Sequence, residues 1–142
     1  MNPSIHHIAI AVHDLDEALA FYCDGLGLEM TERREVPEEG VEIAFLPTGE
    51  GEIELVRPLG EEGGVAHFLE KRGEGLHHIC LAVEDIEAGM ERLRAAGARL
   101  LSKKPRVDVH GTRYVFVHPR STHGVLLELY EVAVDPEGFE NA

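Results

Sequence analysis

Two histidines and two glutamates recur at matching positions in the two halves of the chain. The stretch IHHIAIAVHD, which contains His7, is repeated as LHHICLAVED, which contains His78, at an offset of 71 residues. Further along each half, Glu54 in EIELV corresponds to Glu128 in LLELY at an offset of 74. Imidazole and carboxylate ligands together suit divalent cobalt, nickel, manganese, iron or zinc. We therefore consider whether the fold can bring these four side chains to one metal ion.

The alternation of side chains along the predicted strands places all four residues away from the apolar core. Bulky residues such as Ile8 and Ile10 fill one strand face, so His7 faces the other side together with small alanines. Glu54 and Glu128 each lie between apolar residues that face the core. If the two sheets curl toward each other, the four ligands converge. The small residues beside the histidines leave room, and four protein ligands leave two octahedral positions open for substrate oxygens.

Each of these residues, taken alone, also has an ordinary structural explanation. A glutamate on a strand is usually solvated, and an isolated histidine is more often structural than a metal ligand. The recurrence of both residue types in both halves favours the metal site, although duplication alone could preserve an inert histidine. The first histidine of each doublet, His6 and His77, lies on the packing face, and we assign it a structural role.

The elements that must position these residues form the same order twice, strand, helix and three strands. Asp14 and Asp85 are predicted helix N-caps, and Gly25 or Gly27 ends the first helix as Gly97 ends the second. We predict an α+β fold class with two paired βαβββ modules forming a curved mixed sheet around the metal site. The domain is 4–133, its modules are about 1–70 and 71–134, and 135–142 is a loose tail. The predicted strands are 5–12, 29–34, 41–47, 52–57, 76–83, 99–103, 112–118 and 125–131, with a short helix at 65–71 in the connection.

Composition restricts the class of partner. The 142 residues carry a formal net charge of −14, which disfavours nucleic acid. No apolar run is long enough to cross a membrane, and the first basic residue is Arg33, so the chain does not begin like a signal peptide. Two cysteines form no disulfide framework. We expect a cytoplasmic protein with no nucleic acid or membrane partner.

The chain resembles the vicinal oxygen chelate (glyoxalase/bleomycin-resistance/dioxygenase) superfamily, and within it the family of methylmalonyl-CoA epimerases. The resemblance rests on GLHHICLAVEDIEAGMERLRAAGARLL, on FVHPRSTHGVLLELYE, and on the linker in ELVRPLGEEGGVAHFLEKRGEGLHH. It implies that His7, Glu54, His78 and Glu128 hold a divalent ion, Co²⁺ in the first place and Mn²⁺, Ni²⁺ or Zn²⁺ as alternatives. It further implies a coenzyme A thioester substrate and a homodimer.

The reaction implied by the resemblance is a 1,1-proton transfer through an enediolate, with the metal polarising the substrate oxygens. Glu128 is the expected base. We take Glu42 as its partner because alternation with Ala44 places it on the open face, although a gapless comparison puts Ile43 at the family's position. Three basic residues form the densest cationic cluster, which either binds the coenzyme A tail or is a solvated loop: Lys103, Lys104 and Arg106.

Three other functions share parts of this pattern. A glyoxalase I acting on a glutathione hemithioacetal needs the same four ligands and the same proton abstraction, and the linker and HPRSTHGVLLEL favour the epimerase over it. An extradiol dioxygenase uses two histidines and one carboxylate, so Glu54 as a fourth ligand argues against it. A metal-free binding module of the superfamily typically lacks the ligands, which this chain retains.

Overall fold

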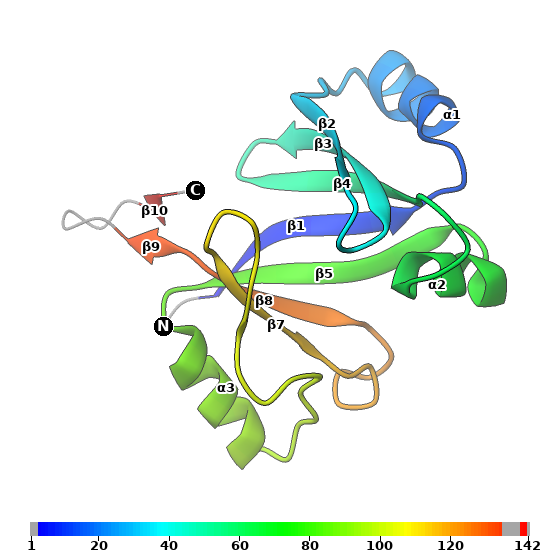
Figure 1. Cartoon of the computed structure of the whole chain (residues 1–142). Helices are drawn as coiled ribbons and strands as arrows, with labels where there is room; N and C mark the ends of the chain where they lie inside the picture. The colour runs from blue at the N-terminus through cyan, green and yellow to red at the C-terminus, as the bar shows by residue number, and fades with distance from the viewer. Residues whose placement is uncertain (1–2, 135–139, 142) are drawn as a thin grey trace. The chain divides into compact units, whose positions relative to one another are not determined.

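The computed structural model describes residues 3–134 and 140–141. The chain divides into two compact units. One comprises His7–His77, and the other comprises Met1–His6 together with His78–Ala142. Each unit contains the expected order of one strand, one helix and three strands (Figure 1). In the second unit the first of these three strands, β6, is only two residues long. The structure confirms the α+β class and the two βαβββ modules.

The unit His7–His77 contains a mixed sheet in the order β2-β3-β4-β1. The neighbouring strands β1 and β4 run parallel, and the other pairs are antiparallel. The last connection holds the short helix predicted at 65–71. The elements are β1 (Ser4–Ala11, whose first three residues belong to the other unit), α1 (Leu15–Leu19), the π-helix η1 (Ala20–Gly25), β2 (Glu32–Val36), β3 (Val41–Thr48), β4 (Gly51–Pro58) and α2 (Gly64–Arg72).

The second unit repeats this topology in the order β5-β8-β7-β6, with β5 and β8 parallel. The predicted strand at 99–103 is wrong, because only a single bridge from Leu100 to Val117 forms there. Arg99 and Leu101 still form backbone hydrogen bonds with His118 and Phe116. Beyond them the carbonyls accept from side chains, since Arg94 donates to Lys103 and Ser102 donates to Lys104. The elements are β5 (Gly75–Val83), α3 (Ile86–Ala95), β6 (Arg106–Val107), β7 (Arg113–Val117), β8 (Leu127–Glu131) and β9 (Ala133–Val134).

Both helices that follow the first strands begin at the predicted N-caps. The carboxylate of Asp14 accepts from the backbone N–H of Glu17 at 3.0 Å, and that of Asp85 accepts from Ala88 at 3.0 Å. The chain turns away after each helix at a glycine with positive φ, Gly27 at 83° and Gly97 at 84°. The caps therefore fix where the strand carrying each histidine gives way to its helix.

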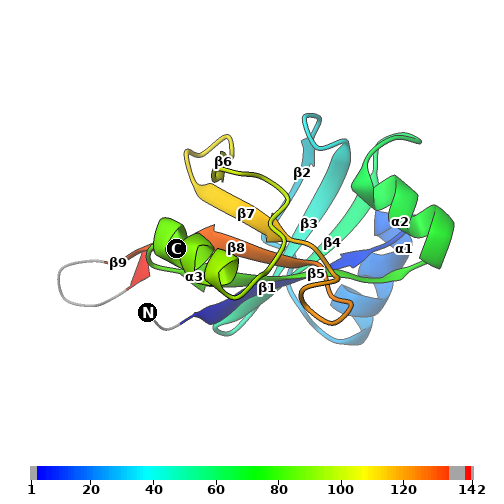
Figure 2. The same cartoon turned by 90° about the horizontal axis from the view of Figure 1, so that it is seen from below.

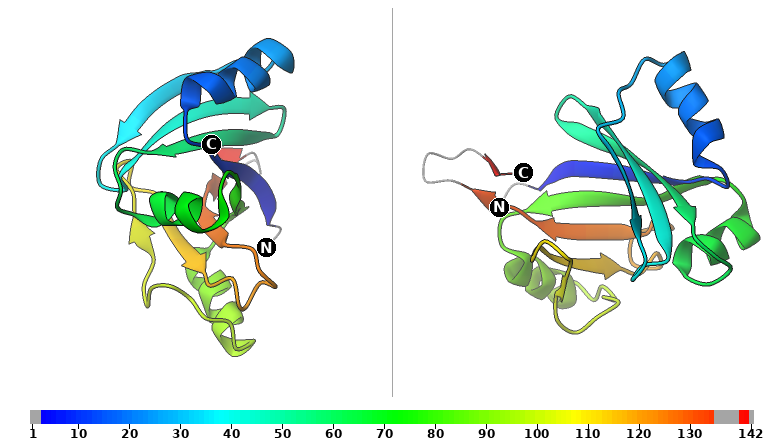
Figure 3. Two further views of the ribbon diagram at one scale, coloured as in Figure 1. Left: turned by 90° about the vertical axis from the view of Figure 1, so that its right-hand side faces the viewer. Right: turned by 45° about the horizontal axis from the view of Figure 1, so that its top comes forward.

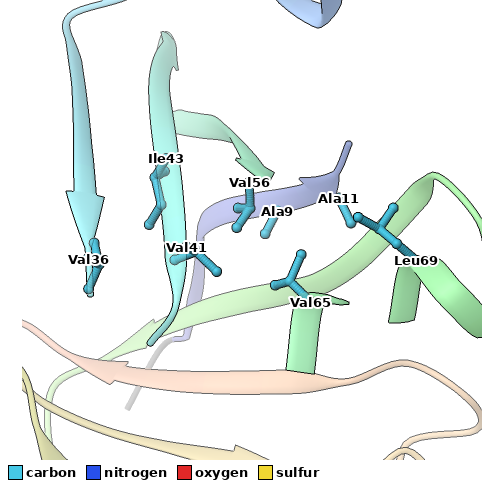
Figure 4. Close-up of a cluster of buried hydrophobic side chains, with 8 residues drawn as sticks. All are labelled: Ala9, Ala11, Val36, Val41, Ile43, Val56, Val65 and Leu69. Atoms are coloured by element: carbon cyan, nitrogen blue, oxygen red, sulfur yellow. The ribbon is translucent and has the colours of Figure 1, made fainter. Parts of the chain in front are cut away.

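Both faces of the β2-β3-β4-β1 sheet are covered by helices. On one face, α1 packs on a cluster that includes Leu15, Leu46 and Leu55. On the other face, Val65 and Leu69 of α2 lie in a cluster with small and branched strand residues (Figures 3 and 4): Ala9, Ala11, Val36, Val41, Ile43 and Val56. The expectation that Ala9 and Ala11 leave room for a ligand is therefore wrong, since both are fully buried against this cluster.

The sheet of the second unit is covered by α3 on the face that carries Val115 and Leu129 (Figure 2). Ile86 and Met90 of α3 complete this core and are almost fully buried. Within the predicted tail 135–142, β10 (Glu140–Asn141) pairs with β9, and residues 135–139 and 142 lie outside the described residues. Among the described helices, none has the length and apolar character needed to span a membrane.

Candidate metal site and active site

The first strand and the last strand of the His7–His77 unit bring one imidazole and one carboxylate together. In the parallel pair β1 and β4, Ala9 is opposite Glu54, so His7 and Glu54 lie on the same face. The Nδ1 atom of His7 is 3.2 Å from Oε2 of Glu54. Only 7% and 10% of the two side chains are exposed, so the pair is held in a region with little water.

The second unit contains the same arrangement in the same register. Cys80 is opposite Glu128 in the parallel pair β5 and β8, and Cys80 corresponds to Ala9 at the offset of 71. The Nε2 atom of His78 is 3.2 Å from Oε1 of Glu128, with 12% and 10% of the side chains exposed. The ring of Phe116 meets the His78 ring edge to face at 5.5 Å. Phe116 lies on β7, and its ring contact holds the imidazole of His78 in this orientation.

The distances within each pair fit two ligands of one metal ion. Ligand atoms about 2.1 Å from an ion are about 3.0–3.4 Å apart at octahedral to tetrahedral angles. The imidazole–carboxylate separation of 3.2 Å in each unit lies in this range. Two carboxylates would also neutralise a divalent charge. The donor set of this chain therefore supports a divalent metal ion.

Glu42 does not share a face with Glu54, and the prediction that it does is wrong. In the antiparallel pair β3 and β4, Phe45 is opposite Glu54, whereas Glu42 is opposite Arg57. The face of Glu42 is the one that α1 covers. There its carboxylate accepts from Arg57 at 2.7 Å and from Arg33 at 3.0 Å. The hydrogen bond from Arg33, followed by that from Arg57, holds the pKa of Glu42 below its ordinary value against the opposing effect of burial.

Glu52, which was not predicted as a site residue, lies two residues before Glu54 and on the same strand face. Burial is the largest cause that raises the pKa of Glu52, while the nearby imidazole of His7 lowers it. A hydrogen bond with Glu54 also acts on this carboxyl. The alternation of side chains that pointed to Glu54 places Glu52 on the same strand face and could have predicted it.

Tyr130 was missed in the same way, two residues after Glu128. Its hydroxyl donates to Oδ2 of Asp108 at 3.2 Å, and its ring lies 4.8 Å from that of His6. Burial raises the pKa of Tyr130, so the hydroxyl keeps its proton at neutral pH. The face of β8 that carries Glu128 therefore also presents a hydrogen-bonded phenol.

The basic cluster lies on the segment that leads from α3 into β6. The guanidinium of Arg106 is 6.0 Å from the ring of Tyr114, which is paired with Tyr130 across the strands. Arg106 thus lies on the same sheet face as Glu128. The backbone carbonyl of Lys103 accepts from Arg94, and these two residues line a hollow with Ser102 and its neighbours.

The chain thus has two βαβββ modules, each with an imidazole on its first strand and a carboxylate on its last strand. This arrangement defines a class of proteins with a metal site. The chain belongs to the glyoxalase/bleomycin resistance protein/dioxygenase superfamily, whose family model matches residues 6–116.

Proteins similar to this chain match it over nearly its whole length. The chain is 45% identical over 130 residues to the ethylmalonyl-CoA/methylmalonyl-CoA epimerase of Cereibacter sphaeroides, and the match covers 90% of this chain and 97% of that protein. A hypothetical protein from Bacillus halodurans has a solved structure with a TM-score of 0.87 and 40% identity, covering 92% and 95% of the two chains. A methylmalonyl-CoA epimerase in complex with methylmalonyl-CoA and ammonium has a TM-score of 0.84 and 36% identity, again covering 92% and 95%.

Proposed function

We propose that this protein is an epimerase that interconverts the (R) and (S) forms of methylmalonyl-CoA by removing and returning the α-proton. One observation carries the proposal. A chain related over nearly its full length to named epimerases keeps a nearly buried imidazole–carboxylate pair in each module, at equivalent register positions. The recurrence of the pair in the same register in both modules supports a shared function for the two pairs.

We propose that His7, Glu54, His78 and Glu128 hold one divalent ion between them. Co²⁺ is the proposed ion, and Mn²⁺, Ni²⁺ and Zn²⁺ are compatible with the same ligands. A bound ion supplies Lewis-acid stabilisation of the negative charge that develops on the substrate oxygens when the α-proton leaves. The metal-bound arrangement is supported by the ligand separations within each unit and by the family to which the chain belongs.

The reaction also requires a carboxylate of the protein that can accept the α-proton. Glu128 is the proposed base, as the likeness to the family suggests. Its carboxylate lies 3.2 Å from the imidazole of His78, and its side chain is only 10% exposed. Glu42 cannot return the proton on the other face, since it faces α1 and is bound to two arginines. The second transfer therefore needs another acid on the Glu54 or Glu128 faces.

The coenzyme A part of the substrate carries several negative charges. Because the chain as a whole is acidic, these charges must be bound by a local group of basic residues. Lys103, Lys104 and Arg106 are the proposed contacts for its phosphates, and Arg106 lies on the Glu128 face over Tyr114. We also propose a cytoplasmic homodimer, by analogy with the family.

The proposal is tested by following one methylmalonyl-CoA epimer by circular dichroism in the presence of Co²⁺-loaded protein. Metal-dependent decay of the signal to that of the equilibrium mixture of the two epimers is the expected result. The hemithioacetal of methylglyoxal and glutathione is assayed in parallel. Turnover of the hemithioacetal with no epimerisation of the thioester would replace the epimerase by a glyoxalase, and turnover of neither would leave a binding module.

A further inference from the structure

The turn between β6 and β7 is tied to the sheet face that carries Glu128. The hydroxyl of Tyr130 donates to Oδ2 of Asp108 at 3.2 Å. The other oxygen of Asp108 accepts from the backbone N–H groups of His110 and Thr112, both at 2.9 Å. The side chain of Thr112 also reaches the Tyr130 hydroxyl. One phenol on the sheet thus bonds to the carboxylate that caps the turn 108–112, and Figure 2 shows this turn between β6 and β7.

The other module shows that the turn does not need this bond in order to form. At the offset of 71, Gly111 with φ +79° corresponds to Gly40 with φ +70°, and each donates its N–H to the carbonyl three residues earlier at 3.0 Å. The positions that correspond to Asp108 and Tyr130 are Pro37 and Val56, which cannot form the bond, and Val56 packs in the α2 cluster instead. The phenol–carboxylate bond is therefore an addition confined to the module with the proposed base.

The position of the tied turn relates it to the substrate. Tyr130 follows Glu128 by two residues on one strand face, a separation of about 7 Å along the strand. A substrate whose α-carbon touches Glu128 places its α-substituent within that distance. Val109 at the tip of the turn is 70% exposed, so the turn that Asp108 holds presents an accessible apolar side chain.

We propose that Tyr130 is a positioning residue that, through Asp108, holds the turn 108–112 as a wall of the acyl-group pocket beside Glu128. This inference rests on the proposed epimerase function. A rigid wall distinguishes substituents that differ by one methylene, a difference worth about 10–200-fold when the pocket is well formed. Loss of the bond loosens the wall and weakens that discrimination without removing the base.

The test compares methylmalonyl-CoA with ethylmalonyl-CoA as substrates of the metal-loaded protein and its Tyr130→Phe variant. We expect the ratio of the two kcat/KM values to change at least threefold and KM to rise about three- to tenfold, while kcat stays within about threefold. Tyr22→Phe is the matched control, because it removes a hydroxyl from the partly buried Tyr22 in the α1 cluster, and it should leave the ratio unchanged.

Two variants of the acceptor separate positioning from folding. Asp108→Asn keeps an oxygen for the two N–H groups and an amide that can donate to the phenol, so it should retain the wild-type ratio. Asp108→Ala should change the ratio at least as much as Tyr130→Phe, and the double variant should add nothing further. If the wild type is active and Tyr130→Phe changes neither the ratio of the two kcat/KM values nor KM, the inference is overturned while the proposed function stands. A wild type inactive on both thioesters rejects the proposed function and this inference with it.

Discussion

At the scale of single residues, Glu54 and Glu128 occupy equivalent positions, yet the proposed function gives them different tasks. Both would be metal ligands, but only Glu128 would also accept the α-proton. An amide oxygen can still serve as a ligand and cannot serve as a base. Glu54→Gln should therefore lower kcat by less than about tenfold, whereas Glu128→Gln should lower it by about 10²–10⁴-fold.

The comparison requires the metal content of each variant, measured alongside the epimerisation rate. Both variants must bind the ion for the rates to report on chemistry. If the metal-loaded Glu128→Gln protein kept most of its activity while Glu54→Gln lost it, the assignment of the base to the second module would be reversed.

Alternation along the strands was sufficient to predict the ligand pairs, because each pair lies on a strand with one clearly apolar face. Ile53 and Leu55 pack on the α1 side, so Glu54 was forced to the other side, beside His7. The same logic failed for Glu42. Its strand is buried on both faces, with Val41 and Ile43 on one side and Ala44 and Leu46 on the other, so alternation could not say which face was open.

At the scale of elements, a network of ion pairs connects the sheet to the helix in each module. In the first module, Arg33 bridges Asp16 of α1 and Glu42 of β3. In the second, Arg113 of β7 bridges Glu87 of α3 and Glu131 of β8. The charges are reversed at the equivalent strand positions. Glu42, which pairs with Arg57, corresponds to Arg113, and Arg57 corresponds to Glu131, which pairs with Arg113. The helix attachment is thus common to both modules, whereas the sign of each charge is free to change.

This network predicts an acid-dependent contribution of Glu42 to stability. The pKa of Glu42 in the folded protein lies below its ordinary value of 4.5, chiefly because of the Arg33 hydrogen bond. A depressed carboxyl pKa contributes stability that is fully present above the unfolded value and is lost as the pH falls through the folded value. Glu42→Gln should therefore lower the free energy of unfolding by about 1 kcal/mol at pH 7.

Urea unfolding at a series of pH values checks this prediction. The difference between wild type and Glu42→Gln should shrink as the pH falls below 4.5. The variant's kcat at pH 7 should stay within about twofold, because the side chain faces α1. A stability difference that is constant down to pH 3, or a large loss of kcat, would contradict the placement of Glu42 in the ion-pair network.

At the scale of the whole molecule, the internal repeat predicted the two modules, their helix caps and the order of helix and strands along the chain in each, apart from the strand expected at 99–103. Two features could not be predicted in the same way. The α2 helix fills the space beside Ala9 and Ala11, which depends on how the linker packs and not on the repeat. The bond from Tyr130 to Asp108 joins a strand to a turn that is 22 residues away in sequence and has no counterpart in the first module.

The proposal that both modules supply ligands to one ion predicts a stoichiometry. The protein should bind one Co²⁺ per chain, and His7→Ala and His78→Ala should each weaken binding at least about tenfold. His77→Ala is the matched control, since its ring packs on Phe68 at 5.2 Å and should leave metal binding nearly intact. Titration calorimetry on each folded variant gives the result. Two ions per chain, or loss of half the sites in each variant, would show separate sites.

The most direct test of the central claim is exchange of the substrate α-proton with solvent. Methylmalonyl-CoA in D₂O is followed by proton NMR with Co²⁺-loaded protein, with chelator-treated protein and with no protein. The account predicts rapid loss of the α-proton signal with the loaded protein only. Exchange no faster than in the protein-free sample would contradict α-proton abstraction and with it the proposed function.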